Sequence, residues 1–421
     1  MTRQPRSNNH TTPTVDVPVG RSIESTGHDP LAWIDEELAG LAAGDLLRDV
    51  VTQRGPQQAV VNVAGRELIN FGSNDYLGLA ADPRTIAAAA EAALAEGCGA
   101  GASPLVTGHV DAHRRLEAKL AEFEGTEAAL VFASGYAANV GTIAALASRD
   151  DVIFADEKNH ASMIDGCRLS RAEVRVYPHN DWRVLATMLD DAAQFRRRMI
   201  ATESLFSMDG DVAPLRQLTE LAEEHDCTLL VDEAHATGVL GAEGRGAAEQ
   251  LGVDSRVHVR IGTLSKALGC GGGFVCGSRR LVRWLVNRAR PYVFSTALSP
   301  PVAAAAIAAL DVVRSEPHRR AELVRRAAEL RAELVRRGWS TTSNSHVVPL
   351  LAGQPARALK WAEQLRAAGL LVPAIRPPSV PEGQALLRIS LSWAHTPEMI
   401  GRLLAALDTL EPAVSDRSKG P

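Results

Sequence analysis

The order of apolar and polar positions divides the chain into three parts, and the first is an N-terminal arm. Apolar residues at helical spacing over 32–50 predict a helix, and the runs at 60–63 and 67–71 predict a hairpin. Residues 1–29 are rich in Asn, Thr, Pro and Ser and show no periodicity, which predicts a disordered tail. We therefore expect the arm over 30–75.

The second part alternates helical patterns with short apolar runs. The runs that read as strands lie at 128–132, 151–155, 174–177, 198–202, 228–231, 257–261 and 273–276. Strands that alternate with helices are typical of an α/β fold with a mostly parallel sheet flanked by helices. We assign this part to a large domain over 76–300.

The third part begins near the Ser-Pro-Pro sequence at 299–301. The elements predicted there are helices at 302–315 and 319–337, strands at 346–351, 371–373 and 385–391, and a last helix at 397–410. This mixture predicts a smaller α+β C-terminal domain over 301–412, with 413–421 as a second tail.

Composition and charge exclude several classes of partner. A hydrophobic content of 46% with 23% charged residues is ordinary for a globular protein. The formal net charge of −5 gives no general attraction for nucleic acid. The longest apolar stretch, 302–313, contains Asp311 and is too short to cross a bilayer. We therefore expect neither a nucleic-acid nor a membrane partner.

Cysteine usage and the N-terminus predict a cytoplasmic protein. The five cysteines are odd in number and form no Cys-x-x-Cys pair, so neither a disulfide framework nor a metal site is expected. The N-terminus also lacks the apolar core of a secretory signal.

A strong local signal is the sequence TLLVDEAH at 228–235, an apolar strand that ends in Asp232 and His235. In a parallel sheet, ligands bind at this end of the strands. Nucleotide-driven helicases use the same DEAH tetrapeptide, but they also need a GxxxxGK[ST] phosphate loop, which we do not find. A helix-capping Asp beside a packed His is the structural alternative.

Lys266 follows the next apolar strand, in the small-residue sequence GTLSKALG at 262–269. A lysine beside a Gly-rich turn is often merely solvated, but its pairing with Asp232 is more specific. Pyridoxal 5′-phosphate (PLP) needs a lysine to hold its aldehyde and a carboxylate to keep its pyridine nitrogen protonated. The two residues together predict a PLP enzyme.

Two further segments fit this cofactor and also have simple structural explanations. The sequence FASGYAAN at 132–139 supplies a strand end, a small-residue turn and a helix, which suits phosphate binding by backbone N–H groups. A plain strand-to-helix turn would look the same. His160 follows another strand end and could stack on the cofactor, or it could be a histidine of a surface loop.

Several motifs in one register resemble the α-oxoamine synthase family of PLP enzymes. They are SNDYLGL at 73–79, NHASMIDG at 159–166, FSMDGD at 206–211, DEAHATG at 232–238 and GTLSK at 262–266. The similarity runs from about residue 31 to residue 410 and implies the PLP-dependent aminotransferase-like fold, called fold type I. The segments 374–381 and 387–391 look most like the biotin-pathway branch of the family.

The resemblance implies roles around the cofactor ring. Lys266 would hold the cofactor and then remove the substrate Cα proton, and Asp232 would pair with the pyridine nitrogen. His160 would stack on the ring. His235 and Ser207 would lie near its phenolic oxygen.

The resemblance also implies contacts farther from the ring. Ser134, Gly135, Tyr136 and Thr263 would surround the phosphate, and Thr296 would reach in from a partner subunit. Asn74 and Arg388 would hold the amino-acid carboxylate, and Arg48 would hold an acyl-substrate carboxylate. Glu203 would lie near the pocket without a defined role. Pro104 stands where the family often has Arg, which puts the acyl or partner-subunit contacts there in doubt.

The implied reaction joins L-alanine to an acyl thioester carried by CoA or acyl carrier protein, with a pimeloyl group in the biotin-pathway branch. Glycine C-acetyltransferase, 5-aminolevulinate synthase and serine palmitoyltransferase share the same motifs and stay open as alternatives. A PLP-fold subunit without turnover is a different alternative, and the retention of Lys266, Asp232 and His160 argues against it. The family also implies a homodimer whose sites are shared.

Overall fold

The structure is a computed structural model and describes residues 29–410. Its largest sheet has seven strands in the order β4 (Ala128–Phe132), β10 (Gly273–Gly277), β9 (Val259–Thr263), β8 (Cys227–Asp232), β7 (Arg198–Glu203), β5 (Val152–Asp156) and β6 (Glu173–Tyr177). Six of the strands run in one direction, and β10 runs in the opposite direction between β4 and β9. The predicted mostly parallel sheet is confirmed.

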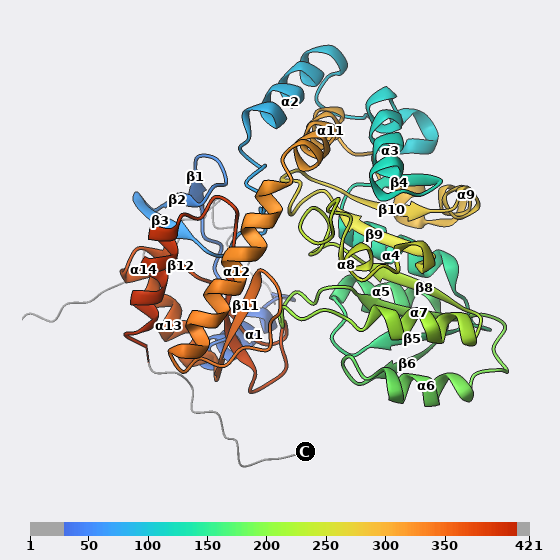
Figure 1. Cartoon of the computed structure of the whole chain (residues 1–421). Coiled ribbons are helices and arrows are strands. Elements are labelled where there is room, and N and C mark those ends of the chain that lie inside the picture. The colour runs from blue at the N-terminus through green and yellow to red at the C-terminus, as the bar shows by residue number, and fades with distance from the viewer. Residues whose placement is uncertain (1–28, 411–421) are drawn as a thin grey trace, which may run out of the picture.

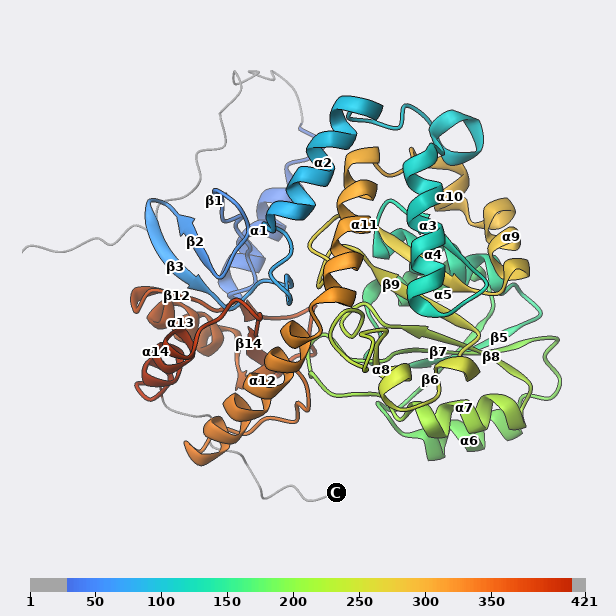
Figure 2. The same ribbon diagram turned by 45° about the horizontal axis from the view of Figure 1, so that its top comes forward.

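Helices cover both faces of this sheet (Figure 2), because alternate strand residues point to opposite sides. Leu130 and Phe132 of β4 belong to a core that includes side chains of α4 (Gly135–Leu146), α5 (Ala161–Ser170), α9 (Arg279–Arg288) and α10 (Arg290–Phe294). Ala129 and Val131 belong to a second core that includes α3 (Asp111–Glu124), α6 (Trp182–Asp190), α7 (Leu215–Glu224) and α8 (Ala247–Gln250).

The C-terminal part contains a smaller antiparallel sheet with its own helices. Its strand order is β11 (Val347–Gly353), β14 (Ala385–Ser390) and β13 (Ala374–Ile375). The helices are α12 (His318–Arg336), α13 (Pro355–Ala367) and α14 (Pro397–Leu407), which lie together in Figure 1. Before them, α11 (Pro300–Ser315) packs against α2 (Pro83–Glu96) and α3.

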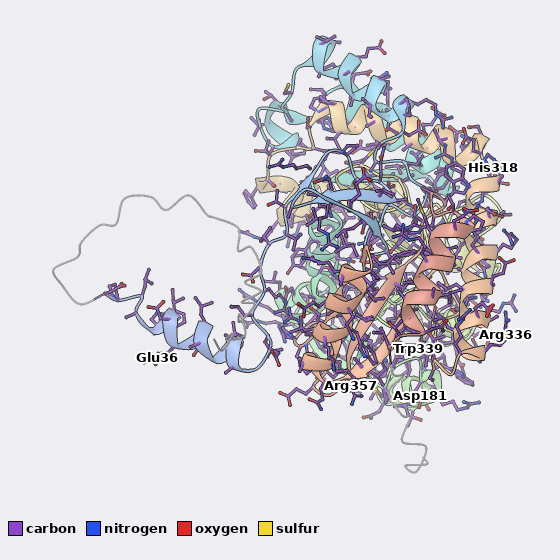
Figure 3. The ribbon with its side chains drawn as sticks, turned by 90° about the vertical axis from the view of Figure 1, so that its left-hand side faces the viewer. Glu36, Asp181, His318, Arg336, Trp339 and Arg357 are labelled. Carbon is purple, nitrogen blue, oxygen red and sulfur yellow. The ribbon has the colours of Figure 1, made fainter. Side chains whose placement is uncertain are left out.

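A third sheet joins the N-terminal hairpin to the C-terminal part. Its order is β1 (Gln53–Arg54), β2 (Val60–Val63), β3 (Arg66–Asn70) and β12 (Leu370–Leu371), with β12 parallel to β3. Figure 1 shows the hairpin beside α13 and α14. The helix α1 (Trp33–Ala43) buries none of its residues, and in Figure 3 it projects from the body near the labelled Glu36.

Three predicted elements were placed wrongly. The helix expected over 32–50 ends at Ala43, because Gly44 follows and Asp45 takes a positive φ of 56°. The strand expected at 257–261 lies two residues later, where β9 pairs with β10. Of the run expected at 371–373, only Leu371 lies in a strand, because β12 ends there and β13 of the small sheet begins at Ala374. The predicted domain boundaries stay predictions.

No helix within residues 29–410 is long and apolar enough to cross a membrane.

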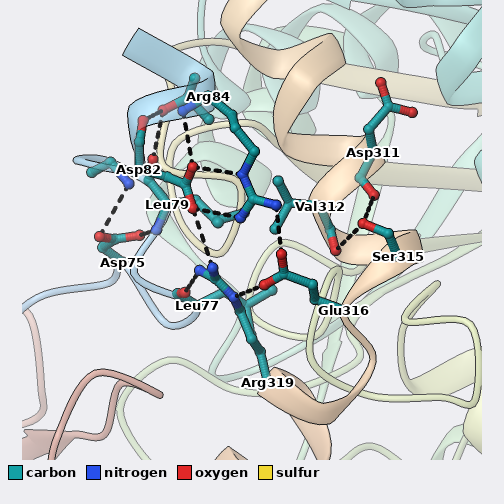
Figure 4. A network of polar contacts seen from close by, with 12 residues as sticks. Asp75, Leu77, Leu79, Asp82, Arg84, Asp311, Val312, Ser315, Glu316 and Arg319 are labelled. Atoms are coloured by element: carbon teal, nitrogen blue, oxygen red, sulfur yellow. Dashed lines mark hydrogen bonds and ion pairs between the residues drawn. The ribbon is translucent and has the colours of Figure 1, made fainter. Parts of the chain in front are cut away.

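A polar network fixes the segment that leads from the hairpin to α2 (Figure 4). Arg319 of α12 is buried and donates to the carbonyl of Leu77 at 3.1 Å, to Asp82 at 3.2 Å and to Glu316 at 2.7 Å. Asp82 caps the N-terminus of α2 and accepts two further side-chain bonds from Arg84. The network thereby ties residues 77–82 to the start of α12.

Loss of Arg319 should destabilise the protein because it leaves the buried Asp82 and the Leu77 carbonyl short of a donor. For Arg319→Met we expect the free energy of unfolding to fall by about 3 kcal/mol, as urea unfolding followed by circular dichroism would measure. Arg325→Met is the matched control, because Arg325 lies on the same helix but its ion pairs with Glu322 and Glu329 are exposed. Equal effects of the two substitutions would contradict the role given to the network.

Candidate active site

The residues predicted to carry chemistry lie along one edge of the large sheet. β5, β7, β8 and β9 are parallel, so their carboxyl ends meet at this edge. The residues at or just beyond those ends are His160 after β5, Glu203 of β7, Asp232 and His235 at β8, and Thr263 and Lys266 at β9. In open α/β sheets this edge is where ligands bind.

Asp232 is a buried carboxylate that two donors hold in place. Its Oδ2 accepts from Asn139 Nδ2 at 2.6 Å, and its Oδ1 accepts from the backbone N–H of Ala234 at 2.8 Å. Asn139, on α4, also donates to Ser162 Oγ at 3.0 Å, and that hydroxyl lies 2.8 Å from His160 Nδ1. A continuous polar chain therefore links Asp232 to His160.

Lys266 is one of only five lysines in the chain, and its environment makes its amine easy to deprotonate. Within residues 29–410 its Nζ has no hydrogen-bond or ion-pair partner. Burial lowers the pKa of Lys266 to about 8, while the carboxylates of Asp232 and Glu203 oppose that shift. The neutral form is therefore far more accessible near neutral pH than for an ordinary lysine.

Glu203 adds a second buried carboxyl group at the end of β7. Burial, and next the charge of Asp232, raise the pKa of Glu203 to about 8, although Lys266 opposes the shift. Its Oε1 is buried without a hydrogen-bond partner in the described part of the chain. The site therefore avoids placing two ionised carboxylates side by side.

A second cluster gathers around Arg388 on β14. The guanidinium donates to Asn74 Oδ1 at 3.1 Å, to the Tyr76 hydroxyl at 3.3 Å and to the carbonyl of Ser207 at 2.7 Å. The Tyr76 hydroxyl also lies 2.6 Å from His235 Nδ1. The cluster thus joins the segment after the hairpin, the large sheet and the small sheet.

His235 is a neutral histidine that contacts Tyr76. Its burial, and next the charges of Lys266 and Arg388, hold the pKa of His235 well below its usual value, so the ring is neutral. The Tyr76 hydroxyl lies 2.6 Å from His235 Nδ1 and 3.1 Å from Asn74 Oδ1, so it connects the neutral ring to the Arg388 cluster.

The turn before α4 is built from small residues and backbone groups. Ser134 caps the helix by accepting from Ala137 N at 3.0 Å. A Cβ at Gly273 would come 2.5 Å from Gly135 Cα, and one at Gly135 would come 3.3 Å from Thr263. This close packing leaves backbone N–H groups at a helix N-terminus, which suits an anion such as phosphate.

Tyr136 stands beside this turn and points to the surface. Its side chain is exposed, and its hydroxyl donates to Asp165. Its ring meets the His160 ring edge-on, with centroids 6.5 Å apart. Tyr136 therefore borders the predicted phosphate region and shares a face with His160.

Two predicted residues are not brought into these clusters. Arg48 is exposed and donates to the carbonyls of Arg376 and Pro377, at 3.3 and 2.8 Å. Thr296 lies on the exposed segment between α10 and α11 and makes no hydrogen bond within residues 29–410.

Sequence reasoning missed three residues that contact the predicted ones. Tyr76 and Asn139 lie inside motifs already singled out, and their polar side chains beside a strand end were the available signal. His346 is buried, both its ring nitrogens lack partners in the described residues, and its ring meets that of Tyr76 edge-on at 4.1 Å. Burial, and next the charge of Arg388, lower the pKa of His346 to about 3. In the sequence His346 is a single histidine before a strand, and nothing there indicated that it is buried against Tyr76.

Comparisons with known proteins agree with this geometry. The model of the family aminotransferase class I and II matches residues 66–407. The curated 8-amino-7-oxononanoate synthase of Anaeromyxobacter dehalogenans (strain 2CP-1) is 52% identical over 383 residues, 91% of this chain and 96% of the relative.

Solved structures match as well. A lysine-to-alanine variant of serine palmitoyltransferase from S. paucimobilis, with a bound PLP–myriocin aldimine, has a TM-score of 0.86 at 30% identity and covers 90% of this chain and 98% of its own. The 8-amino-7-oxononanoate synthase of Francisella tularensis has a TM-score of 0.70 at 28% identity and covers 81% and 97%.

The lowered pKa of Lys266 can be measured through its reactivity. In protein freed of bound small molecules, we expect modification of Lys266 by a small amine-reactive reagent to reach half its maximal rate near pH 8, because only the neutral amine reacts. Peptide mass spectrometry would follow the reaction, with exposed Lys360 of α13 as the internal control for the reagent. A midpoint near the ordinary value of 10.5 would contradict the burial argument.

Proposed function

This chain belongs to the aminotransferase class I and II family, and we propose that it is a PLP-dependent acyltransferase that makes 8-amino-7-oxononanoate. Its substrates are then L-alanine and a pimeloyl thioester. The observation that carries the proposal is the placement of Lys266, an easily deprotonated amine without a bonding partner among residues 29–410, beside the buried carboxylate of Asp232 at neighbouring strand ends.

The residues present fit PLP on three counts. Lys266 has the free amine that would hold the aldehyde, and Asp232 has a fixed carboxylate that would accept from a protonated pyridine nitrogen. The turn at Ser134 and Gly135 offers backbone donors for the phosphate. When bound, PLP supplies an electron sink for negative charge at the substrate α-carbon.

The polar groups around the ring position have distinct tasks in this proposal. His160 would stack on one face of the cofactor ring, and the chain through Ser162 and Asn139 holds its orientation relative to Asp232. His235 would face the phenolic oxygen region with Nε2, because Nδ1 contacts Tyr76. Ser207, whose carbonyl accepts from Arg388, would lie near the same oxygen.

Lys266 moves the proton that starts the reaction. Its neutral amine takes the proton from the α-carbon of alanine, and its conjugate acid returns a proton at the same carbon after CO2 has left. A pKa near 8 suits both steps, because the neutral and protonated forms are both accessible near neutral pH. Glu203, which is largely protonated at pH 7, adds little charge to this pocket.

Arg388 and Asn74 hold the carboxylate of alanine. The guanidinium is fixed by three hydrogen bonds, so it meets the carboxylate in a prepared orientation. The net reaction joins the α-carbon of alanine to the pimeloyl carbonyl carbon, expels the carrier thiol and releases the alanine carboxyl group as CO2. Arg48 is the candidate for the distal carboxylate of the pimeloyl group.

We also infer a homodimer with shared sites, since PLP enzymes of this type are commonly dimeric. Thr296 is exposed and makes no hydrogen bond to the described residues 29–410, which suits a residue that reaches the phosphate of the partner's site. Nearby Phe294 is 70% exposed and Val106 is 72% exposed, as expected for surfaces that a second copy covers.

Pro104 opens the short helical turn Pro104–Gly108, where its missing N–H costs no hydrogen bond.

Turnover with defined substrates tests the proposal. With L-alanine and pimeloyl-CoA, we expect free thiol and CO2 to be released in equal amounts and the product to have the mass of 8-amino-7-oxononanoate. Lys266→Ala should abolish the reaction, because it removes the amine proposed to hold the cofactor and to move the α-proton, while Lys360→Ala should not change it.

Other substrate pairs decide between members of the family. Turnover of glycine with acetyl-CoA, or of serine with palmitoyl-CoA, in place of the alanine reaction would overturn the assigned product but leave the cofactor chemistry intact. The serine pair is included because serine palmitoyltransferase is a structural relative. No turnover with any pair would overturn the proposal.

A further inference from the structure

His179, in the loop after β6, lies between two carboxylates near the active-site edge. Its Nδ1 is 2.9 Å from Asp156 Oδ1 at the end of β5, and its Nε2 is 2.9 Å from Asp211 Oδ2 in the loop after β7. A ring that donates from both nitrogens is a charged imidazolium, and the hydrogen bonds to the two carboxylates raise the pKa of His179 to about 9, although burial opposes the shift.

The same cluster does not make a good cation site. His179, Asp209 and Asp211 offer ligand atoms close together, but both ring nitrogens of His179 already face carboxylates. Asp209 is paired with Lys158 at 2.6 Å, so the lysine ammonium group already lies where a metal ion would have to bind. The cluster is better explained as a means of holding the loop.

The loop held in this way contains a closed turn over residues 206–211. Phe206 N donates to the carbonyl of Asp211 at 3.0 Å, and Gly210 N donates to the carbonyl of Phe206 at 2.9 Å. The Phe206 ring meets the His179 ring edge-on at 4.4 Å, and Asn180 donates a further bond to Asp211 at 2.8 Å. The hydrogen bond from Asn180 and the ring contact with His179 both hold the turn against the loop after β6.

The opposite side of the turn contacts the small sheet and Arg388. Gly210 has a φ of +69°, and a Cβ there would come 2.0 Å from the carbonyl oxygen of Val347 on β11. The Gly210 carbonyl accepts from Asn344 N at 3.2 Å. One residue of the turn, Ser207, presents its carbonyl to Arg388 Nε at 2.7 Å.

We propose that His179 is a positioning residue for Arg388. It fixes the 206–211 turn to the ends of β5 and β6, so that the carbonyl of Ser207 holds the guanidinium in the orientation that binds the amino-acid carboxylate. The inference rests on the proposed function, because it takes Arg388 as the carboxylate ligand. His179 and Asp211 thus orient Arg388, a task that the cofactor-binding residues do not perform.

The test is a double-mutant cycle read by alanine binding to the cofactor-loaded protein. The change in visible absorption on titration with L-alanine gives a dissociation constant without any acyl donor. For His179→Phe, which keeps a ring against Phe206, we expect about tenfold weaker binding of alanine. In the double variant with Arg388→Lys, we expect no further loss beyond that of Arg388→Lys alone, since the effect passes through Arg388.

Two other variants keep the test decisive. Asp211→Asn has nearly the same shape as the native residue and should weaken alanine binding in the same direction, so it replaces His179→Phe in the cycle if that variant does not fold. His225→Phe is the control, because His225 faces Asp190 at 3.9 Å and makes no contact with the turn. It should bind alanine as the unaltered protein does.

Failure of this inference can be distinguished from failure of the proposed function. If the unaltered protein responds to alanine and His179→Phe binds it equally well, the inference alone is wrong. If the losses from His179→Phe and Arg388→Lys multiply in the double variant, His179 acts on general stability and not through Arg388, which also overturns the inference. If the unaltered protein gives no response to alanine, both this inference and the proposed function are overturned.

Discussion

The burial of the Lys266 amine is the constraint on which the rest of the site depends. A charged amine in a dry pocket is costly unless it is paired, and Lys266 has no partner within the described chain. Its pKa therefore falls to about 8, while that of the neighbouring Glu203 rises to about 8. At neutral pH the shift of Glu203 removes most of its negative charge, and the shift of Lys266 makes its neutral amine accessible. The carboxylate of Asp232 is held in place by hydrogen bonds from the Asn139 side chain and the Ala234 backbone N–H. The pocket thus combines a reactive amine with one fixed carboxylate, the pair that a pyridoxal cofactor requires.

Fixed polar chains place the remaining groups around that pair. On one side the chain from Asp232 reaches His160, so hydrogen bonds connect the carboxylate proposed to pair with the cofactor ring to the histidine proposed to stack on it. On the other side Tyr76 joins His235 to Arg388, which couples the cofactor region to the predicted carboxylate site. Arg388 comes from the small sheet, so the site is complete only when the C-terminal part packs against the large sheet. Preorganised donors of this kind need little reorganisation during a reaction.

The sequence predicted the sheet and the candidate residues at its carboxyl edge because both leave short-range signals. Apolar runs that alternate with helical patterns located the strands, and the residues just past those runs, such as Asp232 and Lys266, fall at the expected edge. Elements fixed by long-range pairing were missed or displaced, as β12 shows: two residues near 370 pair with a hairpin near residue 69. The burial of His346 against Tyr76 and the contact of His179 with Asp211 also depend on tertiary packing. No local pattern encodes such contacts.

The central claim is that Lys266 carries the cofactor, and chemical trapping tests it directly. The chain has five lysines, so reduction of the cofactor-loaded protein with borohydride followed by peptide mass spectrometry can locate the attachment without ambiguity. The account predicts one pyridoxyl-phosphate adduct, on the peptide that contains Lys266. An adduct confined to another lysine, or a protein that retains no cofactor after reconstitution with PLP, would contradict it.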